Sequence, residues 1–139
     1  MATYSEVYHN LKNVIKDNTG MSISEILFEI KSNPAQKIDK VFCIEFQTDN
    51  SDKDRGSLRY RVSHDVFITF IKRVNEGKQE LAYTEALDLE DKLIKCLSLQ
   101  SNFPSYRMLY RESRRELSTT RENLLVSVRF NIEHSLELI

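Results

Sequence analysis

Alternation of apolar and polar residues is strictest near the end of the sequence, between Asn123 and His134. Apolar side chains occupy every second position there, at Leu124, Val126, Val128, Phe130 and Ile132. A strand turns successive side chains to opposite faces of its sheet, so this period buries one face and leaves the other face polar. The pattern therefore predicts a half-buried antiparallel strand.

Three more stretches show the same period in a weaker form, within Lys37 to Gln47, Arg59 to Lys72 and Tyr106 to Glu116. Their alternating residues are Phe42, Ile44 and Phe46, then Tyr60, Val62, His64, Val66, Ile68 and Phe70, and finally Met108 and Tyr110. The polar, turn-rich run Thr48 to Gly56 separates the first two stretches. It predicts an antiparallel hairpin with a flexible tip at about 48–57.

Apolar spacing of three and four residues predicts two helices. The first covers Tyr4 to Asp17, with Thr3 or Ser5 as its cap, and it ends before Gly20. The second covers Lys78 to Leu97, and its apolar face contains Ala82, Ala86, Leu89, Leu93 and Leu97. The segment Met21 to Gln36 fits either a short helix that ends before Pro34 or a strand.

Together these elements predict an α+β fold in one domain that spans residues 1–139. The expected order is α-(α)-β-β-α-β-β, where the bracketed element is the short helix of the uncertain segment. A mainly antiparallel four-stranded sheet with two helices packed on one face would bury every apolar stripe described above.

Composition narrows the function classes further. The 139 residues include 20 Lys and Arg and 21 Asp and Glu, a formal net charge of −1. A dedicated nucleic-acid binder usually carries a basic excess, so this balance argues against one and against a polybasic membrane contact. The sequence has no apolar run of the length that spans a bilayer, and no leader pattern at its start. We expect a soluble intracellular protein whose two cysteines, Cys43 and Cys96, are reduced and buried.

Catalytic and cofactor patterns are weak. Phosphate-binding loops need clustered glycines, and the three glycines here are far apart. His64 and His134 fall on inward strand faces, where hydrogen-bonded core or rim histidines are the simpler interpretation than a metal site. Ser63 and His64 are strand neighbours that point to opposite faces and so cannot form a catalytic dyad. The acidic group Asp88, Glu90 and Asp91 predicts a solvated helix face. We therefore expect no enzyme activity, no metal and no cofactor.

Arginines are concentrated in one region of the sequence. Arg107, Arg111, Arg114, Arg115 and Arg121 lie within fifteen residues and, with Tyr110, form a candidate protein interface. A charged edge strand that resists aggregation explains the same pattern equally well. The hairpin tip supplies the second set of candidate interface residues, Asp49, Asp52, Lys53, Asp54 and Arg55.

The order of these elements and their pattern of apolar and polar residues resemble those of the tail-terminator, or tail-completion, proteins of long-tailed bacteriophages. The stretch from Val41-Phe42-Cys43-Ile44-Glu45-Phe46 through Val66-Phe67-Ile68-Thr69-Phe70-Ile71 is similar to their central hairpin. Leu81 to Leu97 is similar to the helix laid on their sheet, and Asn123 to Glu133 to their final strand. The resemblance covers most of the chain but includes no diagnostic motif.

The resemblance implies a structural role in the virion, at the head-proximal end of the tail, after assembly in the host cytoplasm. Such proteins form a ring, usually of six copies, that caps the tail tube, ends its growth and meets the head-side connector. The implied partners are further copies of this chain, the tail-tube protein and the connector protein, while nucleic acid only passes through the ring. The alternatives are a head–tail connector (neck) ring component and a small cytosolic adaptor domain.

Overall fold

The computed structural model describes residues 3–23, 39–53, 59–103, 106–117 and 122–137. Helix α1 spans Tyr4–Thr19, close to the predicted range. The Thr3 hydroxyl accepts a hydrogen bond from the Glu6 backbone N–H, and the Glu6 carboxylate accepts one from the Thr3 N–H, each at 3.2 Å. This capping box selects Thr3, rather than Ser5, as the cap. Gly20 ends the helix at φ 74°, a backbone conformation that glycine adopts without strain.

Helix α3 spans Gln79–Ser98 and buries the apolar face that its spacing predicts. It begins after a turn at Glu76 and Gly77, where Gly77 has φ 76°. A short 3₁₀ helix, η1 (Gln100–Asn102), follows it and leads to strand β4. The Asn102 side chain donates to the Cys96 carbonyl at 2.9 Å and so satisfies one of the open carbonyls at the helix end.

The sheet contains five strands among the described residues, in the spatial order β1-β2-β3-β5-β4. Their bounds are β1 Ser22–Ile23, β2 Val41–Lys53, β3 Arg59–Arg73, β4 Arg107–Leu117 and β5 Asn123–Glu137. All neighbours pair antiparallel except β1, which pairs parallel with Val41 and Phe42 of β2. The α+β class is as predicted, but the expected four-stranded sheet is wrong because β1 adds a parallel fifth strand. Within Met21 to Gln36, residues 22 and 23 take the strand alternative, and residues 24–36 lie outside the described part.

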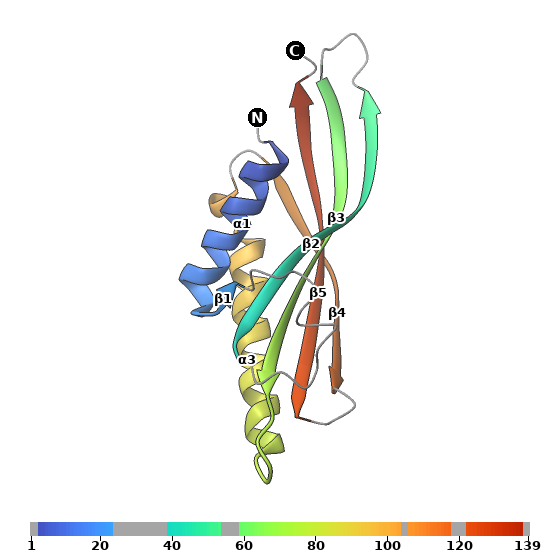
Figure 1. Ribbon diagram of the computed structural model, residues 1–139. Coiled ribbons are helices and arrows are strands. Elements are labelled where there is room, and N and C mark those ends of the chain that lie inside the picture. The colour runs from blue at the N-terminus through green and yellow to red at the C-terminus, as the bar shows by residue number, and fades with distance from the viewer. Residues whose placement is uncertain (1–2, 24–38, 54–58, 104–105, 118–121, 138–139) are drawn as a thin grey trace.

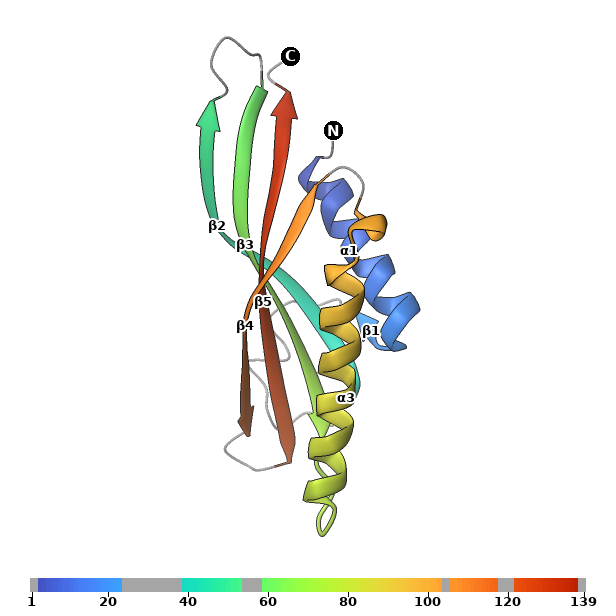
Figure 2. The same ribbon diagram turned by 180° about the vertical axis from the view of Figure 1, so that it is seen from behind.

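Both helices cover the same face of the sheet (Figures 1 and 2). The register places apolar positions of neighbouring strands opposite one another on that face: Phe42 pairs with Phe70, Ile44 with Ile68, and Val66 with Phe130. These residues are buried together with Val7, Leu11 and Ile15 of α1 and Leu93 and Leu97 of α3. The core is therefore one layer between the sheet and the two helices.

The opposite face of the sheet is mixed in character. Cys43 and Ile71 are fully buried on it, where they pack with the partly buried Val41 and Leu125. Nearby, the Thr69 and Ser127 hydroxyls share a hydrogen bond of 3.1 Å across β3 and β5. Cross-strand pairs of this kind hold neighbouring strands in register.

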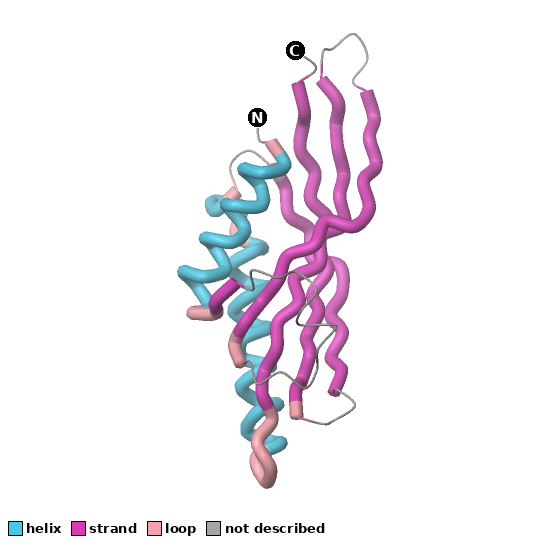
Figure 3. The backbone as a smooth tube through the Cα atoms, in the orientation of Figure 1, coloured by secondary structure: helices cyan, strands magenta, loops and turns pink. Residues whose placement is uncertain are grey.

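Strand β2 runs further than predicted. Residues 48–53 were expected to be part of a flexible loop, but they pair with residues 60–65 of β3 after a register shift at Gln47. Backbone pairing with β3 supplies the hydrogen bonds of this stretch, which a polar, turn-rich sequence does not itself predict. Strands β2, β3 and β5 together continue beyond the helices as a three-stranded arm, here defined as residues 51–53, 59–62 and 134–137 (Figures 1 and 3).

A candidate protein interface on the edge strand

Most of the predicted interface arginines lie on β4, which forms one edge of the sheet. β4 pairs with β5 in regular antiparallel register from Arg107 to Tyr110, and the register then shifts by one residue at Arg111. Tyr110 faces Phe130, whereas Glu112 already faces Arg129, so Arg111 is the extra residue of a β-bulge. Bulges are common on edge strands, where they interrupt further pairing and redirect side chains.

The bulge decides which face each later residue occupies. Ser113, Arg115 and Leu117 pair with Val128, Val126 and Leu124, which are buried on the helix-covered face. Glu112 and Arg114 pair with Arg129 and Ser127 on the opposite face. An uninterrupted strand would place Tyr110 and Arg114 on the same face, so the bulge exchanges the positions of Arg114 and Arg115.

Arg115 uses this position to reach the helix layer. Its guanidinium forms an ion pair and hydrogen bond with the carboxylate of Glu90 on α3. The Glu90 side chain is only 7% exposed, while that of Arg115 is 38% exposed. The hydrogen bond to Glu90 holds the pKa of Arg115 above its ordinary value. Arg115 therefore joins the edge strand to the helices and is not a free interface cation.

The burial of Glu90 corrects the prediction that this residue belongs to a solvated helix face. Glu90 lies four residues after Ala86 and three before Leu93, so it shares the buried stripe of α3. The helical spacing alone places Glu90 on the buried stripe, but its charge predicts an exposed side chain. Asp88 and Asp91 are exposed, as predicted.

Arg107, Arg111 and Arg114 are exposed, and the structure gives none of them an ion pair within the described residues. Tyr110 is 43% exposed and stands edge-on to Phe130, with ring centroids 5.6 Å apart. Its hydroxyl shares a 2.7 Å hydrogen bond with the Ser113 hydroxyl, across the bulge. Arg107 and Arg114 lie on the face away from the helices, Tyr110 lies on the helix-covered face, and Arg111 is the bulge residue. These four exposed residues of β4 are here called the arginine edge.

The remaining candidates are divided between the second half of β2 and the undescribed parts of the chain. Asp49, Asp52 and Lys53 belong to the backbone-paired end of β2. Asp54, Arg55 and Arg121 lie outside the described residues. In the register, Asp52 is opposite Arg61 and Asp49 is opposite His64. The sheet order therefore puts the β2 candidates and the β4 candidates on different strands at opposite sides of the sheet.

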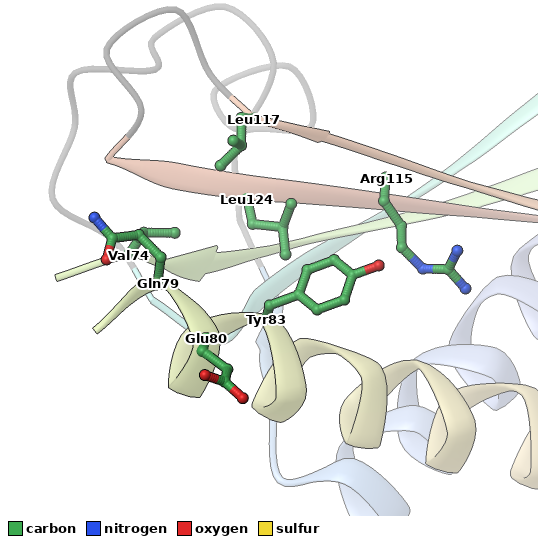
Figure 4. A pocket seen from close by; sticks show the side chains of 7 residues that line it. All are labelled: Val74, Gln79, Glu80, Tyr83, Arg115, Leu117 and Leu124. Carbon is green, nitrogen blue, oxygen red and sulfur yellow. The ribbon is translucent and has the colours of Figure 1, made fainter. Parts of the chain in front are cut away.

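A cavity of about 820 Å³ lies between the start of α3 and the end of β4 (Figure 4). Its apolar lining comes from Val74, Leu117 and Leu124, and its polar lining from Gln79, Glu80, Tyr83 and Arg115. Tyr83 extends from α3 toward β4, where its ring lies near Arg115 (Figure 4). Residue patterns do not predict this cavity, because its size depends on the distance between the helix and the edge strand.

A second buried charge group was also missed. The Lys72 ammonium on β3 is 3.0 Å from a Glu85 carboxylate oxygen on α3 and 3.2 Å from one of Asp39. Asp39 also accepts a hydrogen bond from the Arg73 backbone N–H at 2.9 Å. Burial alone would lower the pKa of Lys72, but the two carboxylates raise it above its ordinary value. This group ties the end of β3 to α3 and to the residues before β2.

The structure places the histidine and the serine that the sequence offered as catalytic candidates, His64 and Ser63, next to each other on β3. Within the described residues, no group of three or more His, Cys, Asp or Glu side chains is placed to hold a metal ion. His64 is buried, with its ring 4.6 Å from that of Tyr4 and 5.7 Å from that of Phe46. Ser63 is on the opposite face, where its hydroxyl accepts a 2.9 Å hydrogen bond from Asn131, as the alternation predicts. None of the helices in the described ranges has the length and apolar character needed to cross a membrane.

Comparisons with known proteins find little. No protein-family profile matches the chain, and no curated protein matches it. Among solved structures, the chain is similar to one from the virion of a native gene transfer agent (GTA) particle, with 12% sequence identity and a TM-score of 0.49. The alignment covers 94% of this chain and 92% of that chain. A likeness this distant carries no functional argument.

Proposed function

We propose that this chain is a structural virion protein that assembles into a ring on the tail tube of a phage-like particle, ends tube growth and joins the tail to the head connector. The observation that carries the proposal is the arginine edge, a set of exposed cations on the open edge strand β4. Exposed arginine is suited to charged protein partners, because its fork of donors pairs with carboxylates while its stem covers apolar surface.

The element order supports the same proposal. Helix α1, the paired strands β2 and β3, helix α3 and the paired strands β4 and β5 follow the order through which the sequence resembles tail-terminator proteins. The arm supplies an extended surface beyond the helices that suits contact with the last ring of the tube (Figure 1). In this proposal the arm meets the tube, and the arginine edge meets neighbouring subunits or tube subunits.

Tube capping provides the test. Purified chain is added to growing tail-tube protein, and tube lengths are measured by negative-stain electron microscopy. The wild-type chain is expected to give tubes of limited length with extra density at one end. The variant Arg107→Glu/Arg111→Glu/Arg114→Glu is expected to need at least a tenfold higher concentration than the wild type to limit tube length. Arg115 stays unchanged, because an acidic residue there would face the buried carboxylate of Glu90.

The matched control is Lys16→Glu/Lys78→Glu/Lys92→Glu. It makes the same change in net charge at exposed lysines of α1 and α3 and at the residue before α3, outside β4. This control should cap tubes like the wild type, and circular dichroism should show the same fold for all three proteins. Capping that survives the arginine changes, or fails equally in the lysine control, contradicts the role of the arginine edge. A wild-type chain that binds the head connector but never a tube end would instead indicate a neck component.

A further inference from the structure

Strand β4 lies at the end of the sheet, and its outer side has no partner strand among the described residues. The backbone N–H and C=O groups on the outer side of an edge strand can pair with a strand of another molecule. After the bulge at Arg111, β4 pairs with β5 without a further shift from Glu112 to Leu117. Residues 112–117, here called the docking stretch, therefore present a regular template for an added strand.

The charge available on β4 is basic once the side chains that already have ionic partners are set aside. Arg115 is paired with Glu90, and Glu112 lies 3.8 Å from Arg129. The exposed charges of β4 without an ion pair within the described residues give a balance of +2: Arg107, Arg111 and Arg114 against Glu116. Like charges on paired strands repel, so this balance disfavours a second β4 edge and favours an acidic strand.

The helix-covered side of the docking stretch borders a cavity. Arg115 and Leu117 lie on that side of β4 and line the cavity of about 820 Å³ opposite Tyr83 of α3 (Figure 4). The cavity reaches the edge of the sheet, because Leu117 belongs to the edge strand itself. Leu117 is 54% exposed and Tyr83 is 45% exposed. Exposed apolar side chains grouped around a cavity are typical of a site that another molecule covers.

We propose that the docking stretch binds an extended segment of a partner protein as an additional strand, and that this segment alternates apolar and acidic residues. Its apolar side chains enter the cavity beside Tyr83, and its acidic side chains lie on the other face, near Arg111 and Arg114. In this mode of binding the backbone hydrogen bonds supply affinity and the alternating side chains supply specificity. The inference deepens the proposed function and rests on it, because it takes the partner to be a tail-tube subunit.

The bulge gives the docking stretch its two different sides. An uninterrupted strand would place Arg114 on the helix-covered face and Arg115 on the opposite face. With Arg111 inserted, Arg115 turns inward to Glu90, and Arg114 stays exposed on the face away from the helices. The bulge also interrupts the regular backbone pattern of β4, so an added strand is continuous only beyond Arg111. This limits the docked segment to about six residues, the length of the docking stretch.

Peptide binding tests the site. The probe is a fluorescent peptide with blocked ends, Glu-Val-Glu-Phe-Glu-Val-Glu, and its isomer Glu-Glu-Glu-Glu-Val-Phe-Val has the same charge without alternation. Fluorescence anisotropy should show that the wild-type chain binds the alternating peptide at least tenfold more tightly than the isomer. Hydrogen–deuterium exchange with mass spectrometry should show slower exchange of the backbone amides in residues 112–117 on binding, since an added strand gives open N–H groups a partner.

Charge reversal tests the role of the arginines. Arg111→Glu/Arg114→Glu should bind the acidic peptide at least tenfold more weakly and should prefer Lys-Val-Lys-Phe-Lys-Val-Lys. The matched control Lys16→Glu/Lys92→Glu makes the same change in net charge at exposed lysines of α1 and α3 and should bind like the wild type. Circular dichroism compares the folds. If charge reversal disturbs the fold, Arg111→Gln/Arg114→Gln takes its place and should also weaken binding.

Four outcomes decide between the alternatives. Equal affinity for the two acidic peptides, or no binding up to about 1 mM, overturns the inference. A dimeric wild-type chain whose residues 112–117 are already protected without peptide would assign the edge to a second copy and also overturns it. Peptide binding as expected in a chain that never caps tubes would leave the docking stretch intact and refute the tail function. Tube capping with which the alternating peptide does not compete would refute the docking stretch and leave the tail function intact.

Discussion

Arg115 on the edge strand β4 and Glu90 on α3 form an ion pair that joins the two layers of the fold at their open side. The pair exists because the bulge at Arg111 turns Arg115 toward the helices. One carboxylate oxygen of Glu90 has no hydrogen-bond partner in the described structure, so Arg115 provides the main compensation for a buried charge. Removing the arginine should therefore cost more than removing both partners.

A double-mutant cycle tests this relationship. Arg115→Met should lower the free energy of unfolding by about 1–2 kcal/mol, less than the loss for a fully buried pair because Arg115 is partly exposed. Glu90→Gln should have a smaller effect, since it removes the buried charge together with the attraction. Urea unfolding of the wild type, both single variants and the double variant gives the coupling energy. A coupling near zero would show that the pair contributes nothing to the stability.

Elements that follow a local period of burial are predicted well from the sequence, and elements that depend on pairing with a distant strand are not. The alternation in β5 and the stripe of α3 predict their elements to within a few residues, because burial repeats with the local period. The sequence predicts that this strand ends at Gln47, whereas β2 continues to Lys53 because pairing with β3 overrides the turn preference of Thr48 to Lys53. The two-residue β1 depends on its partner, and so few residues leave no periodic signal.

The candidate site shows the same limit. The arginine cluster on β4 is visible in the sequence, and Arg107, Arg111 and Arg114 are exposed. The different environment of Arg115 was not predictable, because a bulge of one residue changes the face of everything after it and has no sequence signature here. Sequence patterns thus locate the charged strand, while the register between β4 and β5 decides which charges are available.

Lys72 should make the stability depend on alkaline pH. Its folded pKa is raised by Glu85 and Asp39, so its contribution is fully present below the ordinary value of 10.5 and is lost as the pH rises through the folded pKa. The free energy of unfolding of the wild type should therefore fall above pH 10.5. Lys72→Arg, whose guanidinium stays charged there, should lose less stability over the same range. Equal pH profiles in urea unfolding would contradict this assignment and attribute the loss to other groups.

Asn10 connects α1 to the start of β4. Its side-chain amide donates to the Tyr106 hydroxyl at 2.8 Å and to the Asn102 carbonyl at 3.1 Å. Asn10→Ala should lower the free energy of unfolding by about 1–2 kcal/mol, because two partly buried acceptors lose their donor. Tyr106→Phe removes only the first contact and should cost about half as much. Thermal unfolding compares the two, with exposed Asn13→Ala on the same helix as the control.

Both cysteines should resist thiol reagents in the folded protein. Cys43 and Cys96 are 0% and 4% exposed, and burial raises the pKa of Cys96 to about 11. Only the thiolate reacts, so at pH 8 the thiol is both inaccessible and protonated. Iodoacetamide followed by intact mass spectrometry should show no modification in buffer and two modifications in 6 M urea, an ordinary denaturing concentration. The Cys96→Ala variant assigns the remaining signal to Cys43. Rapid modification of Cys96 in buffer would mean that the sheet and helix layers open far more often than their packing allows, and rapid modification of Cys43 would mean the same for the cover of the opposite face.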